Sequence, residues 1–199
     1  NISENGNNDY YDRVMWLKTY MCLNTCDALK AYNFLIDWPD GDYDQFVCFY
    51  RYVFAFVLYY QRKLDFMTVR EHMKQSNKLS QKSYGVSTTS TRELLAGEKE
   101  NIYLLHDSMD MDWGKLNNEE RERYRDEHCL LMTGQVDSIE NSLISIKFSL
   151  DNIHSFIAKL PPAESIGGWN QGDMVTFVLG FSFSEMRAWN IRRRDDTVE

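Results

Sequence analysis

The sequence predicts an all-α protein, an irregular bundle of about five helices, and three observations carry that prediction. From Val136 to Leu160, apolar residues recur at alternating intervals of three and four, the pattern of a helix with one buried stripe. Between Phe46 and Tyr60 every residue but Arg51 is apolar or aromatic, which is typical of a helix buried on all sides. No segment has a convincing strand pattern, so helices are the predicted building blocks.

The first half of the chain predicts a polar tail and two long helices. Residues 1–9 are polar and are expected to form a disordered tail. An apolar stripe indicates a helix over 10–37, which the Trp-Pro-Asp-Gly sequence at 38–41 ends, because proline disfavours helix at the preceding residue. A second helix is predicted over 43–74. The polar segment 75–91 has the composition of a mobile loop.

The second half of the chain carries two helix start signals. Ser90 is followed three residues later by Glu93, and Asn117 by Glu120, and both pairs fit a capping box. Gly134 is expected to break or kink the helix that follows Asn117. The predicted elements are a short helix over 92–106 and long helices over 118–160 and 171–193.

Composition bounds the class of protein. A chain of 199 residues with 43% hydrophobic content and no evident linker predicts one helical domain, over 10–194. The net charge of -8 argues against general attraction to nucleic acid or anionic membrane. The apolar run at 46–60 is shorter than the roughly 20 residues of a bilayer span. Four irregularly spaced cysteines suit reduced thiols and a cytoplasmic or otherwise intracellular reducing compartment: Cys22, Cys26, Cys48 and Cys129.

Motifs for cofactor, metal or nucleophilic chemistry are missing from the sequence. Gly167-Gly168 has no neighbouring strand, third glycine or lysine that would make a phosphate loop. The chain has no repeated Glu-x-x-His pattern for a metal site in a bundle. We therefore predict no cofactor and no metal, and a non-enzymatic helical-bundle module that acts through a protein partner or self-assembly.

One alternative function comes from the run Arg123-Tyr124-Arg125-Asp126-Glu127-His128. This run resembles the Arg-x4-6-His signature of the HEPN superfamily, helical bundles that cut RNA without a metal. The resemblance implies that His128 acts on the ribose 2'-hydroxyl or the leaving group. It also implies that Arg121 or Arg123 holds the scissile phosphate, normally across a dimer. Imidazole titrates near neutral pH and guanidinium matches phosphate geometry, so the residue types suit this chemistry.

A second alternative is a small apolar ligand bound between the helices around 46–60. The aromatic side chains of that segment are the kind that line apolar pockets. The arginines at 192–194, in contrast, need no ligand, because cations at the end of a helix complement its dipole.

Overall fold

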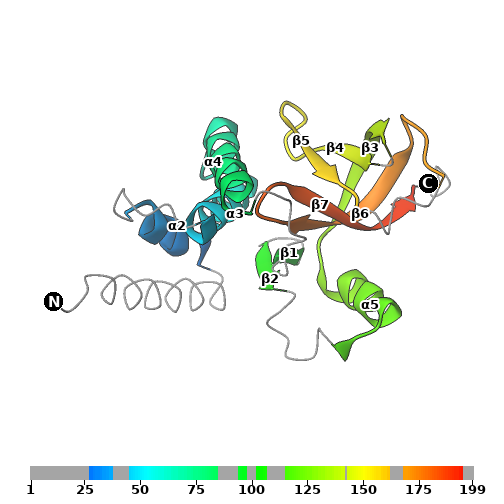
Figure 1. The fold of residues 1–199 in the computed structure, drawn as a ribbon, viewed down its shortest axis with the longest axis horizontal. Helices are drawn as coiled ribbons and strands as arrows, with labels where there is room; N and C mark the ends of the chain where they lie inside the picture. The colour runs from blue at the N-terminus through cyan, green and yellow to red at the C-terminus, as the bar shows by residue number, and fades with distance from the viewer. Residues whose placement is uncertain are drawn as a thin grey trace.

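The structure is a computed structural model that describes residues 27–37, 45–84, 94–97, 102–106, 115–141, 143–161 and 168–194. Three helices lie together at one end of a β-barrel, and a fourth packs beside its last strand (Figure 1). The three are α2 (Ala28–Ile36), α3 (Gln45–Tyr60) and α4 (Phe66–Tyr84), and the fourth is α5 (Asn118–His128).

Among the described residues, seven strands form one sheet in the order β2-β1-β6-β3-β4-β5-β7, and an additional β6–β7 pairing closes five of them into a barrel. Neighbouring strands are antiparallel except β5 and β7, which are parallel. The closed ring β3-β4-β5-β7-β6, with its one parallel pair, has the strand order of the OB-fold, a five-stranded Greek-key barrel. The strands are β1 (Leu94–Gly97), β2 (Tyr103–His106), β3 (Leu131–Glu140), β4 (Leu143–Ser149), β5 (Ser155–Lys159), β6 (Met174–Phe181) and β7 (Met186–Arg193).

The all-α prediction is wrong, because the predicted helix over 118–160 is helical only as far as His128. The rest of that range forms β3, β4 and β5. Within β4, Ile144, Ile146 and Phe148 are buried in strict alternation with more exposed neighbours, which is the period of a strand. Within β3 the predicted stripe joins buried Val136 to exposed Ile139, and within β4 it joins exposed Leu143 to buried Ile146. The helical spacing therefore combined residues from both faces of the strands and was a coincidence.

The predicted helices over 92–106 and 171–193 are wrong as well. The first range contains the antiparallel pair β1 and β2, and the second contains β6 and β7. Arg192 and Arg193 consequently lie at the end of a strand, and the proposed interaction with a helix dipole does not apply. Gly134, predicted to kink a helix, lies within β3.

The helical segments also differ from their predicted limits. The range 43–74 contains two helices, α3 and α4, separated by a turn in which Arg62 has a φ of 59°. Helix α4 continues to Tyr84, through the first part of the predicted loop over 75–91. The predicted tail, the break at 38–41 and most of the predicted helix over 10–37 lie outside the described residues. The single domain over 10–194 stays a prediction, without its all-helical character.

The capping box on α5 is present as the residues indicated. The Asn117 side chain accepts from the Glu120 backbone N–H at 2.9 Å, and the Glu120 carboxylate accepts from the Asn117 backbone N–H at 2.8 Å. Two of the four backbone donors that a helix start leaves free are thereby satisfied.

Aromatic side chains join α3 to the barrel. The ring of Phe56 lies edge-on to both Phe156 of β5 and Phe181 of β6, with centroids 5.2 Å apart in each case. Tyr52 makes a similar contact with Phe181. These residues are buried, so α3 closes the end of the barrel at which β6 ends and β5 begins. In the described ranges no helix combines the length and the apolar character needed to cross a membrane.

We predict that Gly134→Ala destabilises the barrel. A Cβ at this position would lie 2.6 Å from the Ile146 side chain and 2.8 Å from the Lys147 carbonyl oxygen. The second contact is with backbone of the paired strand, so relief requires the strands to shift, at a cost of about 1–3 kcal/mol. Urea denaturation measures the change.

Ser155→Ala, at an exposed position on β5, is the control, with an expected change of less than about 0.5 kcal/mol. Equal stabilities for Gly134→Ala and the control would contradict the close strand approach at Gly134.

Candidate functional site

The residues predicted for RNA cleavage all lie on α5. Arg121 is partly buried, whereas Arg123 and His128 are exposed. Arg123 and His128 are five residues apart and so point about 140° apart around the helix, which leaves only Arg121 near the His128 side. The His128 ring contacts Tyr124, with centroids 4.6 Å apart. The described residues form a barrel with helices at its end and side instead of a helical bundle. The predicted helical-bundle module, the ribonuclease alternative and the ligand-binding bundle are therefore wrong as stated.

A neighbouring arginine, Arg125, has a role that the sequence did not reveal. Its guanidinium lies 4.0 Å from the ring centroid of Trp189 on β7, and its Nη1 donates to Asn190 Oδ1 at 3.4 Å. The Asn190 amide in turn donates to the Glu122 carbonyl at 2.7 Å and to the Asp126 carboxylate at 2.9 Å. These contacts attach α5 to β7, and Arg125 is buried between them.

We predict that substitutions of Arg125 and His128, both on α5, affect the stability of the fold very differently. Arg125→Met should lower the free energy of unfolding by about 1–3 kcal/mol, because it removes the cation–π contact and leaves polar partners unpaired. His128→Ala should change it by less than about 0.5 kcal/mol, since the side chain is exposed. Urea denaturation followed by tryptophan fluorescence measures both. A larger loss for His128→Ala than for Arg125→Met would refute this assignment.

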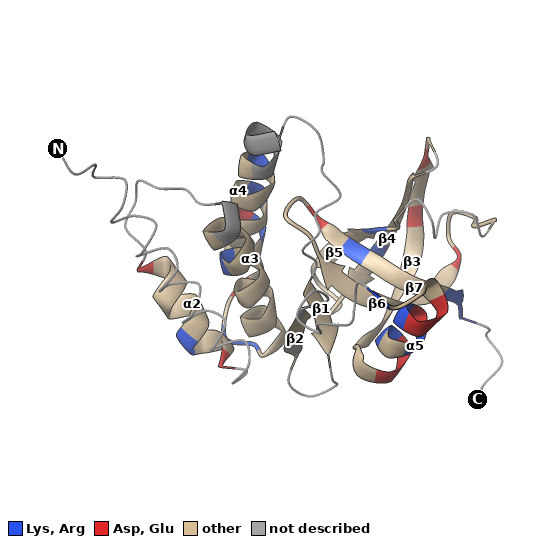
Figure 2. Cartoon of the chain, turned by 60° about the horizontal axis from the view of Figure 1, so that its bottom comes forward, with Lys and Arg blue, Asp and Glu red and all other residues tan. Residues whose placement is uncertain are grey.

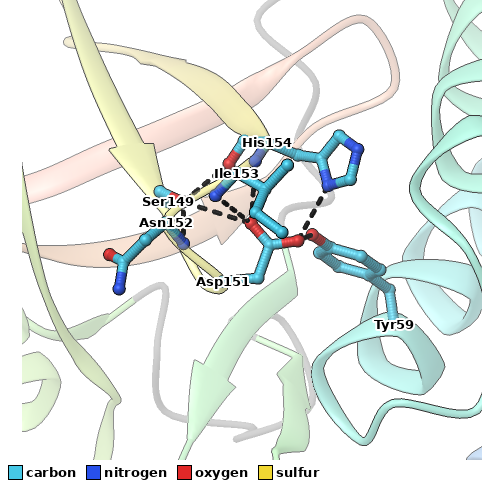
Figure 3. A network of polar contacts seen from close by, with 6 residues as sticks. All are labelled: Tyr59, Ser149, Asp151, Asn152, Ile153 and His154. Carbon is cyan, nitrogen blue, oxygen red and sulfur yellow. Dashed lines mark hydrogen bonds and ion pairs between the residues drawn. The ribbon is translucent and has the colours of Figure 1, made fainter.

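A second cluster lies in the loop between β4 and β5, where the Asp151 carboxylate accepts hydrogen bonds from several directions (Figure 3). Its Oδ1 accepts from the backbone N–H groups of Ile153 at 2.9 Å and His154 at 2.8 Å. Its Oδ2 accepts from the Tyr59 hydroxyl at 2.5 Å and lies 2.8 Å from His154 Nδ1. One carboxylate thereby fixes the loop backbone and joins it to α3.

Local sequence chemistry explains the shape of this loop. Asn152 has a φ of 62°, a left-handed conformation that asparagine adopts more easily than most residues. The Ser149 hydroxyl accepts from the Asn152 N–H at 2.9 Å and donates to the His154 carbonyl at 2.7 Å. The Ser149 hydroxyl thus closes the turn and holds its backbone where no strand pairing does.

Hydrogen bonding and burial favour one protonation state for each of Asp151 and Tyr59. The backbone N–H of His154, followed by the Tyr59 hydroxyl, holds the pKa of Asp151 well below its usual range. Burial, followed by the hydrogen bond to the Asp151 carboxylate, raises the pKa of Tyr59 to about 12. Asp151 is therefore ionised and Tyr59 neutral at physiological pH, which is the combination that their hydrogen bond requires.

His154 joins the same loop to the helices. Its ring stacks on Phe66 at the start of α4, with centroids 4.5 Å apart and an interplanar angle of 23°. Its Nδ1 faces Asp151 Oδ2, and Nε2 is the ring nitrogen that does not face this carboxylate. The hydrogen bonds of Asp151 to loop backbone and to α3 favour a structural role for the pair. Within the described ranges no group of three His, Cys, Asp or Glu side chains could hold a metal ion.

The loop and the two strands that it joins present a row of outward side chains, which we call the β4–β5 face. Ile153 at the loop is 80% exposed, Leu143 48% and Ile157 40%. Register places Lys147 directly opposite Ile157. The face consists of Leu143, Ser145, Lys147 and Ser149 on β4, Ile153 in the loop, and Ser155, Ile157 and Lys159 on β5.

The β4–β5 face carries or adjoins charged groups of both signs. Its strand residues include Lys147 and Lys159, and acidic groups lie beside them, Asp151 in the same loop and Glu140 opposite Leu143. Lys159 pairs with Glu185 at 2.7 Å. Figure 2 shows both acidic and basic segments on α5, while the strands of the barrel are mostly uncharged. The exposed apolar side chains of the face therefore lie among both basic and acidic groups.

The sequence did carry a signal for this face. From Ile144 to Ser149, apolar residues alternate strictly with polar ones, as in a half-buried strand. No known protein-family model, curated protein or solved structure matches the chain.

We predict that the Tyr59–Asp151 contact makes stability depend on alkaline pH. The pKa of Tyr59 is raised from its ordinary 10.0 to about 12, so the neutral hydroxyl stabilises the fold below pH 10 and this contribution is lost as pH rises toward 12. Tyr59→Phe should therefore lower the melting temperature at neutral pH, and its difference from the wild type should shrink above about pH 10.

Thermal unfolding of both proteins between about pH 7 and about pH 11 provides the test. Tyr59→Phe introduced together with Asp151→Asn is the matched control, because the contact is already lost there and the hydroxyl should matter less. A difference between wild type and Tyr59→Phe that stays constant through pH 11 would rule out the contact.

Proposed function

We propose that this barrel is a binding module that contacts a protein partner through the β4–β5 face. The observation that supports the proposal is the exposure of Ile153, Ile157 and Leu143 on elements that hydrogen bonds hold in place. Removing apolar surface from water contributes about 25 cal/mol for each Å², so burial of these aliphatic side chains by a partner is favourable.

The position of this face agrees with the topology of the barrel. Strands β4 and β5 are the second and third of the closed ring, counted from β3. In OB-folds the face formed by these two strands binds extended polymers. The agreement is an analogy between folds and supports the location of the contact rather than the identity of the partner.

The chemistry of the face favours protein over single-stranded nucleic acid. Proteins that bind single strands use exposed aromatic rings for base stacking and a basic groove for phosphates. The two aromatic residues of β4 and β5, Phe148 and Phe156, are buried in the barrel. The outward positions are aliphatic, hydroxyl or lysine side chains, and they suit the mixed apolar and polar surface of a protein.

Site-specific photocrosslinking tests the proposal. The photoreactive residue benzoylphenylalanine replaces Ile157 in one variant and Glu119, exposed on α5, in a matched control. On irradiation in the cells that express the protein, the Ile157 variant should give discrete adducts that protease removes and nuclease does not. Adducts that nuclease removes, or no excess of adducts over the Glu119 control, would contradict the proposed function.

A further inference from the structure

We propose that His72 is a pH-sensitive contact that holds α2 against α3 and α4 at neutral pH and releases it in mildly acidic solution. The three helices lie together in Figure 1. The His72 ring belongs to α4, contacts Tyr32 of α2 and lies within electrostatic range of Arg51 of α3. This contact lies outside the β4–β5 face and is independent of the proposed function.

Helix α2 is attached through little buried apolar surface. Of its nine residues three are buried, Ala28, Ala31 and Leu35. Two of the three are alanines, which remove less apolar surface from water than larger side chains, so polar contacts carry a larger share of the attachment. The Tyr32 hydroxyl lies 3.0 Å from His72 Nε2, and Arg51 Nε donates to the Leu35 carbonyl at 2.7 Å. Each of these contacts joins α2 to another helix.

The surroundings of His72 favour the neutral imidazole. Its Nε2 faces the Tyr32 hydroxyl, whereas its Nδ1 is shielded from solvent and, among the described residues, has no hydrogen-bond partner of normal geometry. A protonated ring carries a donor at both nitrogens. Its Nδ1 donor would therefore be buried without an acceptor, and burying a charged donor in this way costs more than burying a neutral nitrogen.

Neighbouring charges on balance oppose protonation of the ring. Burial, followed by the positive charge of Arg51, lowers the pKa of His72 below its ordinary 6.5. Gln75 and Glu71, both on α4, act in the opposite direction. Glu71 is exposed and already pairs with Lys74 at 2.8 Å, so its attraction for a charged ring is weakened.

The α2 side of the contact carries no charge in acid. Burial raises the pKa of Tyr32, while Arg51 and Asp65 shift it in opposite directions, so its hydroxyl stays protonated. The titrating group in this contact is therefore His72.

The sign of the effect follows from the lowered pKa of His72. The contribution of the contact is fully present above about pH 6.5 and is lost as the pH falls through the lowered pKa. Protonation weakens the contact to Tyr32 and places a second positive charge near Arg51, the residue that binds the Leu35 carbonyl. Both polar contacts of α2 are thereby affected, while the aromatic contacts between α3 and the barrel are not.

Amide hydrogen exchange of the 15N-labelled chain at a series of pH values tests the inference. Protection factors are compared, because they correct for the pH dependence of the chemical exchange step. Between about pH 7 and about pH 5, the protection of the Ala31 and Leu35 amides of α2 should fall about fivefold or more. The amide of Phe177 in β6 should keep its protection, since the barrel stays folded.

Two variants separate His72 from other titrating groups. His72→Gln keeps an amide that can bond to Tyr32 but cannot become charged, so the protection of α2 should stay constant between the two pH values. His128→Gln, at an exposed position on α5, is the matched control and should behave as the wild type.

The wild type alone provides a second readout, from NMR titration of the His72 ring. The loss of α2 protection should begin below about pH 6.5 and level off once this ring is protonated. Constant protection of α2 in the wild type, an equal loss in His72→Gln, or a loss that continues after the ring is protonated would overturn the inference. An equal loss at Phe177 would also overturn it, because the whole fold would then open rather than α2.

Discussion

The packing of α3 against the open end of the barrel is the contact on which the rest of the structure depends. Phe56 touches both Phe156 and Phe181, which belong to different strands, so one helix side chain bridges the barrel wall. Without the helix, these rings would lose their apolar surroundings at the end of the barrel. Helix α4 adds a second attachment, because the buried Ser76 hydroxyl donates to the Phe183 carbonyl at 2.6 Å. The helices and the barrel therefore share one core.

Helix α3 also contacts the candidate site. Tyr59, at the end of α3, reaches the Asp151 carboxylate, and that carboxylate orders the loop that carries Ile153. Ile153 is thus largely exposed on a loop whose backbone is held by hydrogen bonds. Binding to a preorganised surface avoids much of the entropy cost of ordering a loop on contact. The polar network around Asp151 therefore holds in place the loop that carries Ile153.

Local chemistry predicted local features of this chain and failed where contacts are distant in sequence. The capping box at Asn117 marked the start of a helix because its hydrogen bonds span one turn. The strands were missed because two turn residues, Asn141 and Asn152, were not recognised, and both have positive φ values. The parallel β5–β7 pair, which the barrel also needs, joins Ala158 to Met186, far apart in sequence. None of the β4–β5 face was predicted as a site, since its residues converge only after the strands pair.

Amide hydrogen exchange at Ile153 and His154 tests the central claim most directly. The account predicts that these loop N–H groups are protected although Ile153 is 80% exposed, because both donate to Asp151. It also predicts that Asp151→Ala removes their protection while the core strand amide of Phe177 keeps its own. Exchange of the two loop amides at the rate of an unstructured chain in the wild type would contradict the claim that Asp151 holds the loop that presents the binding face.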